Sequence, residues 1–123
     1  PSSLKRKAAG SIIGNWTSAT VSTEWSYLDW PVSSADLEKL RGVRFVFTSG
    51  SHALEIDGVE LLENGKVIAH DRHAGLAGKP SRGNFYKLSL PKGIHANNGC
   101  SLRARVRSVG GKSSNGKLEL IKE

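Results

Sequence analysis

Hydrophobic and polar residues alternate along most of this chain, which is the period of a half-buried β-strand. In SLRARVRSV, residues 101–109, leucine, alanine and valine share one face and three arginines share the other. GVRFVFTSG places Val43, Phe45 and Phe47 on one face in the same way. With similar runs in FYKLSL and KLELI, we expect about eight short strands. The pattern therefore predicts an all-β protein.

Two glycine-containing pairs indicate how some of these strands connect. Asn64-Gly65 in ELLENGKVIA is a hairpin signal, because both residues tolerate the positive φ of a type I′ turn. Asp57-Gly58 in LEIDGVEL has apolar residues on both sides. We therefore expect a bulge within one strand at that point.

Short strands with regular turns favour an antiparallel β-sandwich of the jelly-roll type. Only SSADLEKL, at 33–40, has a helical pattern, with Ser33 or Ser34 as its N-cap. The segment AGLAGKPSRGN is expected to be a loop of about eleven residues without secondary structure of its own. At 123 residues the chain is long enough for one domain. Residues 1–9 are interpreted as a linker and residues 10–123 as a single β-sandwich module.

Composition and charge narrow the function classes. Neither an apolar run long enough to span a membrane nor a signal peptide is visible, so no membrane partner is expected. The single cysteine, Cys100, excludes an internal disulfide. Eighteen Lys and Arg against eleven Asp and Glu give a net charge of +7. That charge favours an anionic partner, although basic surfaces also serve solubility alone.

The order of motifs resembles a known module. SIIGNW, STEWSYLDWPV, RGVRFVFTSGSHALEIDGVELLENGKVIAHDRHAG and LRARVRSVGG followed by SNG are similar to a β-sandwich at the C-terminal ends of exported bacterial glycoside hydrolases, notably β-hexosaminidase-like enzymes. The likeness covers nearly the whole chain, with VELLENGKVIAHDRHAG as its most specific block. More broadly, the chain is similar to galactose-binding-like jelly-rolls. This resemblance implies a non-catalytic accessory domain of a secreted or periplasmic bacterial enzyme, and it carries no binding residues onto these positions.

Catalysis is not expected from the residues either. A glycosidase needs two carboxylates that face each other across a cleft. Glu55 and Asp57 lie on one face of a predicted strand, with Glu60 close by in sequence, so they are interpreted as solvated strand charges. The serines lack a GxSxG setting, and no glycine-rich phosphate loop opens a helix.

Aromatic residues concentrate in TEWSYLDWPV, residues 23–32. Alternation places Trp30 in the core, and it places Trp25, Tyr27 and Asp29 on the opposite face. An exposed ring is a rigid platform for the C–H face of a sugar, and Asp29 beside it accepts hydrogen bonds from hydroxyls. The alternative is that Trp25 and Tyr27 pack beneath a loop or against a neighbouring domain. Trp16 in SIIGNW is interpreted as a core residue of the first strand.

The HDRHAG segment and the long loop after it supply further candidates. Asp71 and His73 alone make an incomplete transition-metal site, because neither a cysteine nor a second cluster accompanies them. We therefore expect them to organise the start of the loop instead. Lys79, Arg82 and Asn84 are candidate donors to sugar hydroxyls or to anionic substituents.

A structural calcium ion is a further possibility that the resemblance implies. Its ligands would be backbone carbonyls and one or two acidic side chains. The acidic candidates are Glu24, Asp57, Asp71 and Glu119. In GGKSSNG the acidic residue expected near Lys112 or Ser113 is missing, which argues against a metal role for that loop.

Three arginines, Arg103, Arg105 and Arg107, line one strand face about 7 Å apart. Guanidinium groups bind sulfate and carboxylate with paired hydrogen bonds, so an acidic polysaccharide, sulfated or uronate-bearing, is one hypothesis. The alternative is that carboxylates on neighbouring strands neutralise this stripe. The candidates for that role are Glu55, Glu60 and Glu119.

These observations predict a carbohydrate-binding module that targets an attached glycoside hydrolase to a polysaccharide. The first alternative is a structural domain that supports the catalytic domain without binding glycans. A nucleic-acid-binding domain is a weaker alternative, because basic and aromatic residues do not combine in a recognisable motif.

Overall fold

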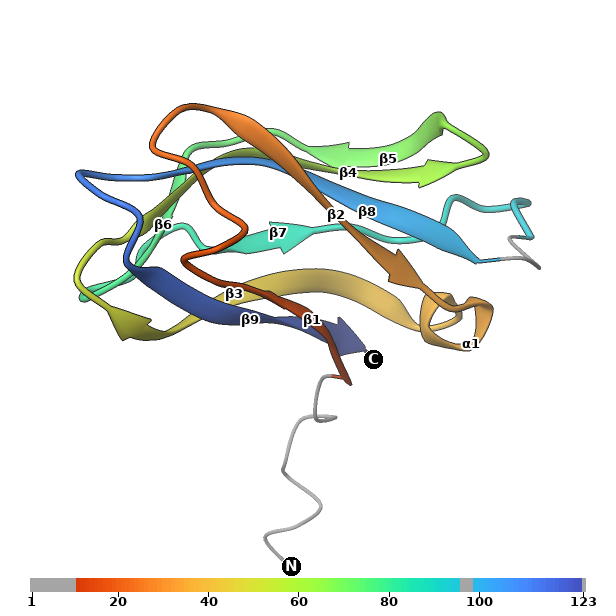
Figure 1. Cartoon of the computed structure of the whole chain (residues 1–123). Coiled ribbons are helices and arrows are strands. Elements are labelled where there is room, and N and C mark those ends of the chain that lie inside the picture. Colours follow the sequence, from red (N-terminus) through yellow and green to blue (C-terminus); the bar gives the residue numbers. More distant parts are fainter. Residues whose placement is uncertain (1–10, 96–98, 123) are drawn as a thin grey trace, which may run out of the picture.

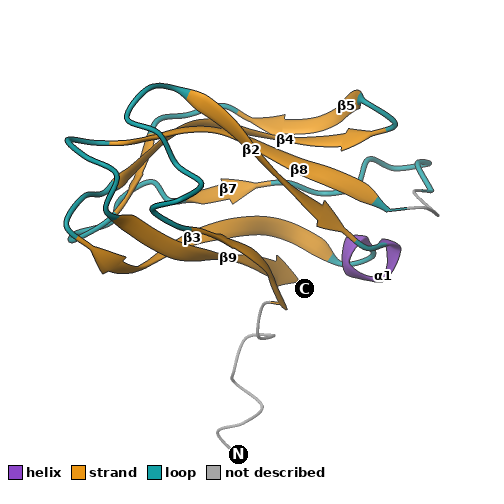
Figure 2. Ribbon diagram, viewed as in Figure 1, coloured by secondary structure: helices purple, strands orange, loops and turns teal. Residues whose placement is uncertain are grey.

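The structure is a computed structural model that describes residues 11–95 and 99–122. Two β-sheets pack face to face, and the loops gather at the two ends of the sandwich (Figures 1 and 2). The predicted linker, residues 1–9, lies outside the described residues. The elements are β1 (Ser11–Trp16), β2 (Ser26–Val32), α1 (Ser34–Leu37), β3 (Leu40–Gly50), β4 (Leu54–Glu63), β5 (Lys66–Asp71), β6 (Gly75–Ala77), β7 (Phe85–Lys87), β8 (Cys100–Ser108) and β9 (Ser114–Lys122).

The strand order is that of a jelly-roll. One sheet has the order β1-β9-β3-β7, and the other has the order β2-β8-β4-β5, with β6 also paired to β4. All of these pairings are antiparallel. The chain crosses between the sheets at most connections, as it does in jelly-rolls. The predicted antiparallel β-sandwich is therefore confirmed.

Aromatic side chains form the centre of the core between the sheets. The Phe45 ring lies 6.0 Å from Trp16, 6.2 Å from Trp30 and 5.7 Å from Tyr86, measured between ring centres. Each buried indole N–H has an acceptor: Trp16 donates to Ser114 Oγ at 3.0 Å, and Trp30 donates to a backbone carbonyl at 2.9 Å. The assignment of both tryptophans to the core is confirmed.

The glycine-containing pairs behave as the sequence predicts. Asn64 and Gly65 have φ of 52° and 80° and connect β4 to β5. Within β4 the register shifts between Ile56 and Gly58, so Asp57-Gly58 forms a bulge in one continuous strand.

The predicted helix is present but ends at Leu37, earlier than the 33–40 pattern suggests. Ser33 is its N-cap, and the Ser33 hydroxyl accepts a hydrogen bond from the Asp36 N–H. In the part of the chain that the structure describes, no helix is long and apolar enough to cross a membrane.

The prediction of a structureless loop over AGLAGKPSRGN is wrong. Its first residues form β6, and Ala77 pairs with Leu54 of β4. Beyond β6 the chain folds back, so that Leu76 and Arg82 exchange two backbone hydrogen bonds of 2.8 and 2.9 Å. A three-residue strand is too short to give an alternating pattern, so the sequence carries no period-two signal for it.

Candidate functional site

Strand β8 presents three arginines on the outer side of the β2-β8-β4-β5 sheet. The alternate residues Leu102, Ala104 and Val106 are buried between the sheets, as predicted. The arginines therefore emerge on the opposite side, in a row along the strand. We call this outer surface the arginine face; it comprises Trp25, Tyr27, Asp29, Glu55, Asp57, Glu60, Arg72, Arg103, Arg105 and Arg107.

The bulge in β4 places three carboxylates opposite these arginines. Glu55 pairs in register with Arg107 before the bulge, and Glu60 pairs with Arg103 after it. Strict alternation from Glu55 would point residue 59 outward, but the extra residue reverses the phase, so Val59 is buried and Glu60 faces outward. The bulge is thus what allows Glu55, Asp57 and Glu60 to share one face.

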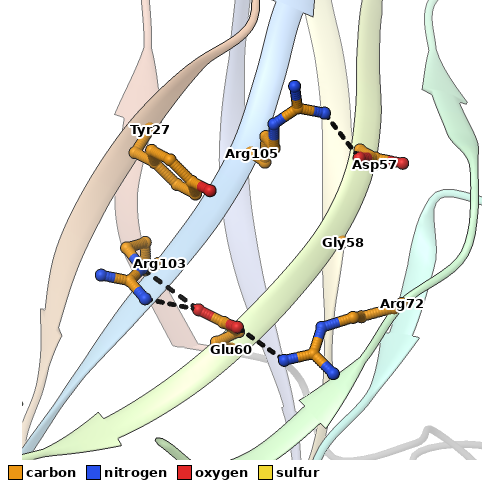
Figure 3. A pocket seen from close by; sticks show the side chains of 7 residues that line it. All are labelled: Tyr27, Asp57, Gly58, Glu60, Arg72, Arg103 and Arg105. Carbon is orange, nitrogen blue, oxygen red and sulfur yellow. Dashed lines mark hydrogen bonds and ion pairs between the residues drawn. The ribbon is translucent and has the colours of Figure 1, made fainter. Parts of the chain in front are cut away.

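Glu60 links Arg103 of β8 to Arg72, which directly follows β5 (Figure 3). Its Oε1 accepts from Arg103 Nη2 at 2.7 Å and Nε at 3.2 Å, and its Oε2 accepts from Arg72 Nη2 at 2.8 Å. The hydrogen bond from Arg72, followed by that from Arg103, holds the pKa of Glu60 below its ordinary value, although partial burial acts in the opposite direction. The hydrogen bond to Glu60 likewise raises the pKa of Arg103.

The other two arginines of β8 are also paired. Arg105 Nη1 lies 2.6 Å from Asp57 Oδ2, and Arg107 Nε lies 2.7 Å from Glu55 Oε1. In the structure, carboxylates on the neighbouring strand therefore neutralise the three arginines of β8. Sequence reasoning missed Asp57 as a partner in this network, although alternation already places Asp57 on the same face as Glu55.

The expected role of Glu119 in neutralising the stripe is wrong. Glu119 lies on β9, in the other sheet, where its carboxylate is 3.5 Å from Arg44. The crossover that separates β8 from β9 places consecutive strands in different layers, so closeness in sequence does not bring Glu119 to β8.

The two predicted aromatic platforms differ in how much of each ring is free. The guanidinium carbons of Arg105 and Arg107 lie 4.6 and 4.8 Å from the centre of the half-buried Trp25 ring. Arg103 lies 5.2 Å from the Tyr27 ring, yet Tyr27 remains 59% exposed. Cation–π contacts therefore occupy Trp25, whereas Tyr27 keeps a large accessible surface.

Tyr27 stands at the edge of a shallow hollow. In Figure 3 its ring lies between Arg103 and Arg105, and Glu60 lies between Arg103 and Arg72. A side chain at Gly58 would bring its Cβ to 3.3 Å from Arg72 Cγ, so glycine in the bulge leaves this space open. The hollow is lined by Tyr27, Asp57, Gly58, Glu60, Arg72, Arg103 and Arg105.

The remaining candidates on the β2 strand and in the long loop are spread out. Asp29 faces outward, in register with Arg103. Arg82 lines a second hollow together with Glu55. Lys79 is exposed and lines neither of these hollows. Asn84 donates from Nδ2 to the Phe45 carbonyl at 2.7 Å, so its amide holds β3 to the segment before β7.

Asp71 and His73 organise the chain between β5 and β7, as predicted. Asp71 Oδ1 is 2.9 Å from His73 Nδ1, and Asp71 Oδ2 accepts from the Lys87 N–H at 2.8 Å. His73 Nε2 is 2.9 Å from the Gly83 carbonyl, and its ring stacks on Tyr86 at 4.0 Å. Burial lowers the pKa of His73, but the bond to Asp71 and then that to Gly83 outweigh burial and raise the pKa above its ordinary value.

The expected calcium ligands do not come together. Asp57, Asp71 and Glu119 contact Arg105, His73 and Arg44 respectively, in three separate places. Among residues 11–95 and 99–122, no three His, Cys, Asp or Glu side chains form a group that fits a metal ion.

No protein-family model matches the sequence, and no curated protein is significantly similar to it.

Proposed function

We propose that this chain is a non-catalytic glycan-binding module and that the arginine face is its binding surface. The observation that carries the proposal is the position of Tyr27. Its ring is 59% exposed and borders a hollow whose other walls are paired guanidinium and carboxylate groups. An aromatic ring beside fixed polar groups is the combination that sugar recognition requires.

A sugar ring offers both kinds of contact that this surface makes. Its C–H face packs on the Tyr27 ring, while its hydroxyl groups both donate and accept hydrogen bonds. Arg103 and Arg105 supply N–H donors, and the oxygens of Glu60 and Asp57 retain lone pairs beyond those used by the arginines. Because the ion pairs already hold these side chains in place, binding costs less conformational entropy than it would with free side chains.

The lowered pKa of Glu60 supports a binding role over a hydrolytic one. A glycosidase general acid needs a carboxyl group whose pKa is raised, so that it carries a proton near neutral pH. Glu60 is shifted in the opposite direction by its two arginines. We therefore expect the purified chain to release no reducing sugar from any polysaccharide that it binds.

The proposed role within a larger protein is to target a glycoside hydrolase to its substrate. A linked binding module raises the effective concentration of the catalytic domain at the polysaccharide surface. This attachment, and the secreted or periplasmic location that goes with it, are supported by the resemblance of the motifs alone.

Affinity electrophoresis tests the proposal. The wild-type protein is run through native gels that contain dextran, laminarin, xylan, hydroxyethyl cellulose or glycol chitin. At least one polymer should retard it, and Tyr27→Ala should weaken that binding by about 1 kcal/mol, close to fivefold. Phe85→Ala, which removes an exposed ring from the other sheet, is the matched control and should migrate like the wild type. Retardation by none of the polymers would favour the structural alternative.

A further inference from the structure

The arginine face is electrically balanced. Four guanidinium groups, those of Arg72, Arg103, Arg105 and Arg107, share it with the four carboxylates of Asp29, Glu55, Asp57 and Glu60. Each arginine contacts a carboxylate at 2.6 to 2.8 Å. The net charge of +7 that the whole chain carries therefore lies elsewhere on the molecule.

This balance disfavours a polyanionic ligand. A sulfate or uronate group placed over the arginines would also lie close to Glu55, Asp57 and Glu60, whose repulsion offsets the attraction. An anion that binds the remaining N–H groups of one of these arginines would lie beside the carboxylate already bound there. A hydroxyl group meets no such conflict, because it donates to a carboxylate and accepts from a guanidinium.

A second hollow lies on the same side of the sheet, next to the arginine face. It is lined by Glu55, Ala74, Gly75, Leu76, Arg82 and Gly83, and its volume is about 290 Å³, against about 80 Å³ for the hollow at Tyr27. Leu76 pairs in register with Glu55, which in turn pairs with Arg107. Arg107, Glu55 and Leu76 are therefore neighbours across the sheet, and the last two line the second hollow.

Contacts between named residues connect the two hollows. Arg105 lines the first hollow, and Arg107 is bonded to Glu55 in the wall of the second. Trp25 lies against both guanidinium groups and so fixes their spacing. Two residues along a strand span about 7 Å, a distance that a ligand of more than one sugar unit covers.

We infer that the ligand is an uncharged oligosaccharide that lies along β4, the strand that lines both hollows, with one sugar unit against Tyr27 and another beside Arg82. This inference rests on the proposed function and names its substrate class. Arg82 is exposed and lines the second hollow, and its guanidinium can donate to a sugar hydroxyl.

Two measurements test the inference on a polymer that retards the wild type. In the first, the neutral polymer is compared with its sulfated derivative on the same backbone, such as dextran with dextran sulfate, at about 0.05 M and about 0.5 M NaCl. The neutral form should bind with an affinity that changes less than twofold with salt. Binding of the sulfated form alone, lost at high salt, would overturn the inference while leaving a glycan-binding function in place.

In the second measurement, calorimetry follows a series from disaccharide to hexasaccharide of the retained polymer. Affinity should rise until both hollows are filled, and Arg82→Ala should lower hexasaccharide affinity several-fold while leaving disaccharide affinity unchanged. Lys79→Ala, in the same loop but outside both hollows, should match the wild type. A flat length series, or equal hexasaccharide binding by Arg82→Ala, would overturn the two-hollow inference. If no polymer in either charge state binds, the proposed function itself fails.

Discussion

The two outer faces of the sandwich use aromatic and basic residues in opposite ways. On the arginine face, Tyr27 is 59% exposed and stands beside a polar hollow. On the other sheet, Phe85 is 37% exposed, but a Cβ at Gly42 would lie 2.5 Å from a ring atom of Phe85, so the ring packs closely against Gly42. Arg44 covers it from 5.7 Å. Tyr27 therefore offers more accessible ring surface beside polar groups than Phe85 does, which is why we propose Tyr27 as the platform.

The carboxylates Glu60 and Glu119, one on each face, differ in how many hydrogen bonds they accept and how exposed they are. Glu60 accepts three hydrogen bonds from two arginines, and its side chain is only 18% exposed. Glu119 has one contact with Arg44, at 3.5 Å, and is 28% exposed. Glu60, Arg72 and Arg103 therefore hold one another in position, which is what a preorganised binding surface needs.

The largest effect should come from the core that supports both faces. Phe45→Ala removes the ring that contacts Trp16, Trp30 and Tyr86, and should lower the free energy of unfolding by about 3 to 5 kcal/mol. Urea denaturation followed by tryptophan fluorescence measures the loss. Phe85→Ala provides the comparison and should cost less than about 1 kcal/mol; similar losses for the two variants would mean that Phe45 does not sit at the centre of the core.

An intermediate effect should distinguish the ion pairs of the two faces. Glu60→Gln leaves Arg72 and Arg103 without their carboxylate and should lower the free energy of unfolding by about 1 kcal/mol. Glu119→Gln should lower the free energy of unfolding by only about 0.3 kcal/mol, because the single contact of Glu119 is long and exposed. Denaturation at low and high salt measures both, and an equal cost for the two variants would remove the distinction between the faces.

The smallest effect concerns the contacts of Asp71 and His73, which connect the two sheets. His73 follows β5 in one sheet, while its partner Asp71 accepts from Lys87 of β7 in the other. The folded protein raises the pKa of His73, so its stabilising contribution is complete below the unfolded value of about 6.5 and is lost as pH rises through the folded value. Unfolding free energy should therefore fall by a few tenths of a kcal/mol between about pH 6 and pH 8.

A His73→Asn variant should lose this part of the pH dependence while keeping any contribution from the other histidines. Glycan affinity should stay constant over the same range, because His73 and Asp71 do not line either hollow. An identical pH profile of unfolding free energy for the variant and the wild type would contradict the proposed titration of His73.

Features that depend on local order could be predicted from the sequence. The alternation in β8 gave the outward arginines, and Asp57-Gly58 and Asn64-Gly65 gave the bulge and the hairpin. These signals act within a few residues, so no tertiary information is needed to read them.

The composition of the site required long-range pairing that the sequence does not show. Arg105 and Asp57 are 48 residues apart and meet only because β8 lies beside β4. The contact of the Arg105 guanidinium with the Trp25 ring likewise depends on the pairing of β2 with β8. The strand order also decides that Glu119 belongs to the other sheet. Neighbouring strands in a jelly-roll are distant in the chain, so partners across strands escape a pattern read along it.

The most direct test of the central claim is a map of the bound glycan on the two faces. Backbone and arginine Nε–H signals of the labelled protein are followed by NMR during titration with a hexasaccharide of the polymer that retards it. The shifts should concentrate on β2, β4 and β8, with Arg103 and Arg105 among the largest, while β1, β3 and β9 stay unchanged. Shifts centred on Arg44 and Phe85 would contradict the assignment of the arginine face as the binding surface.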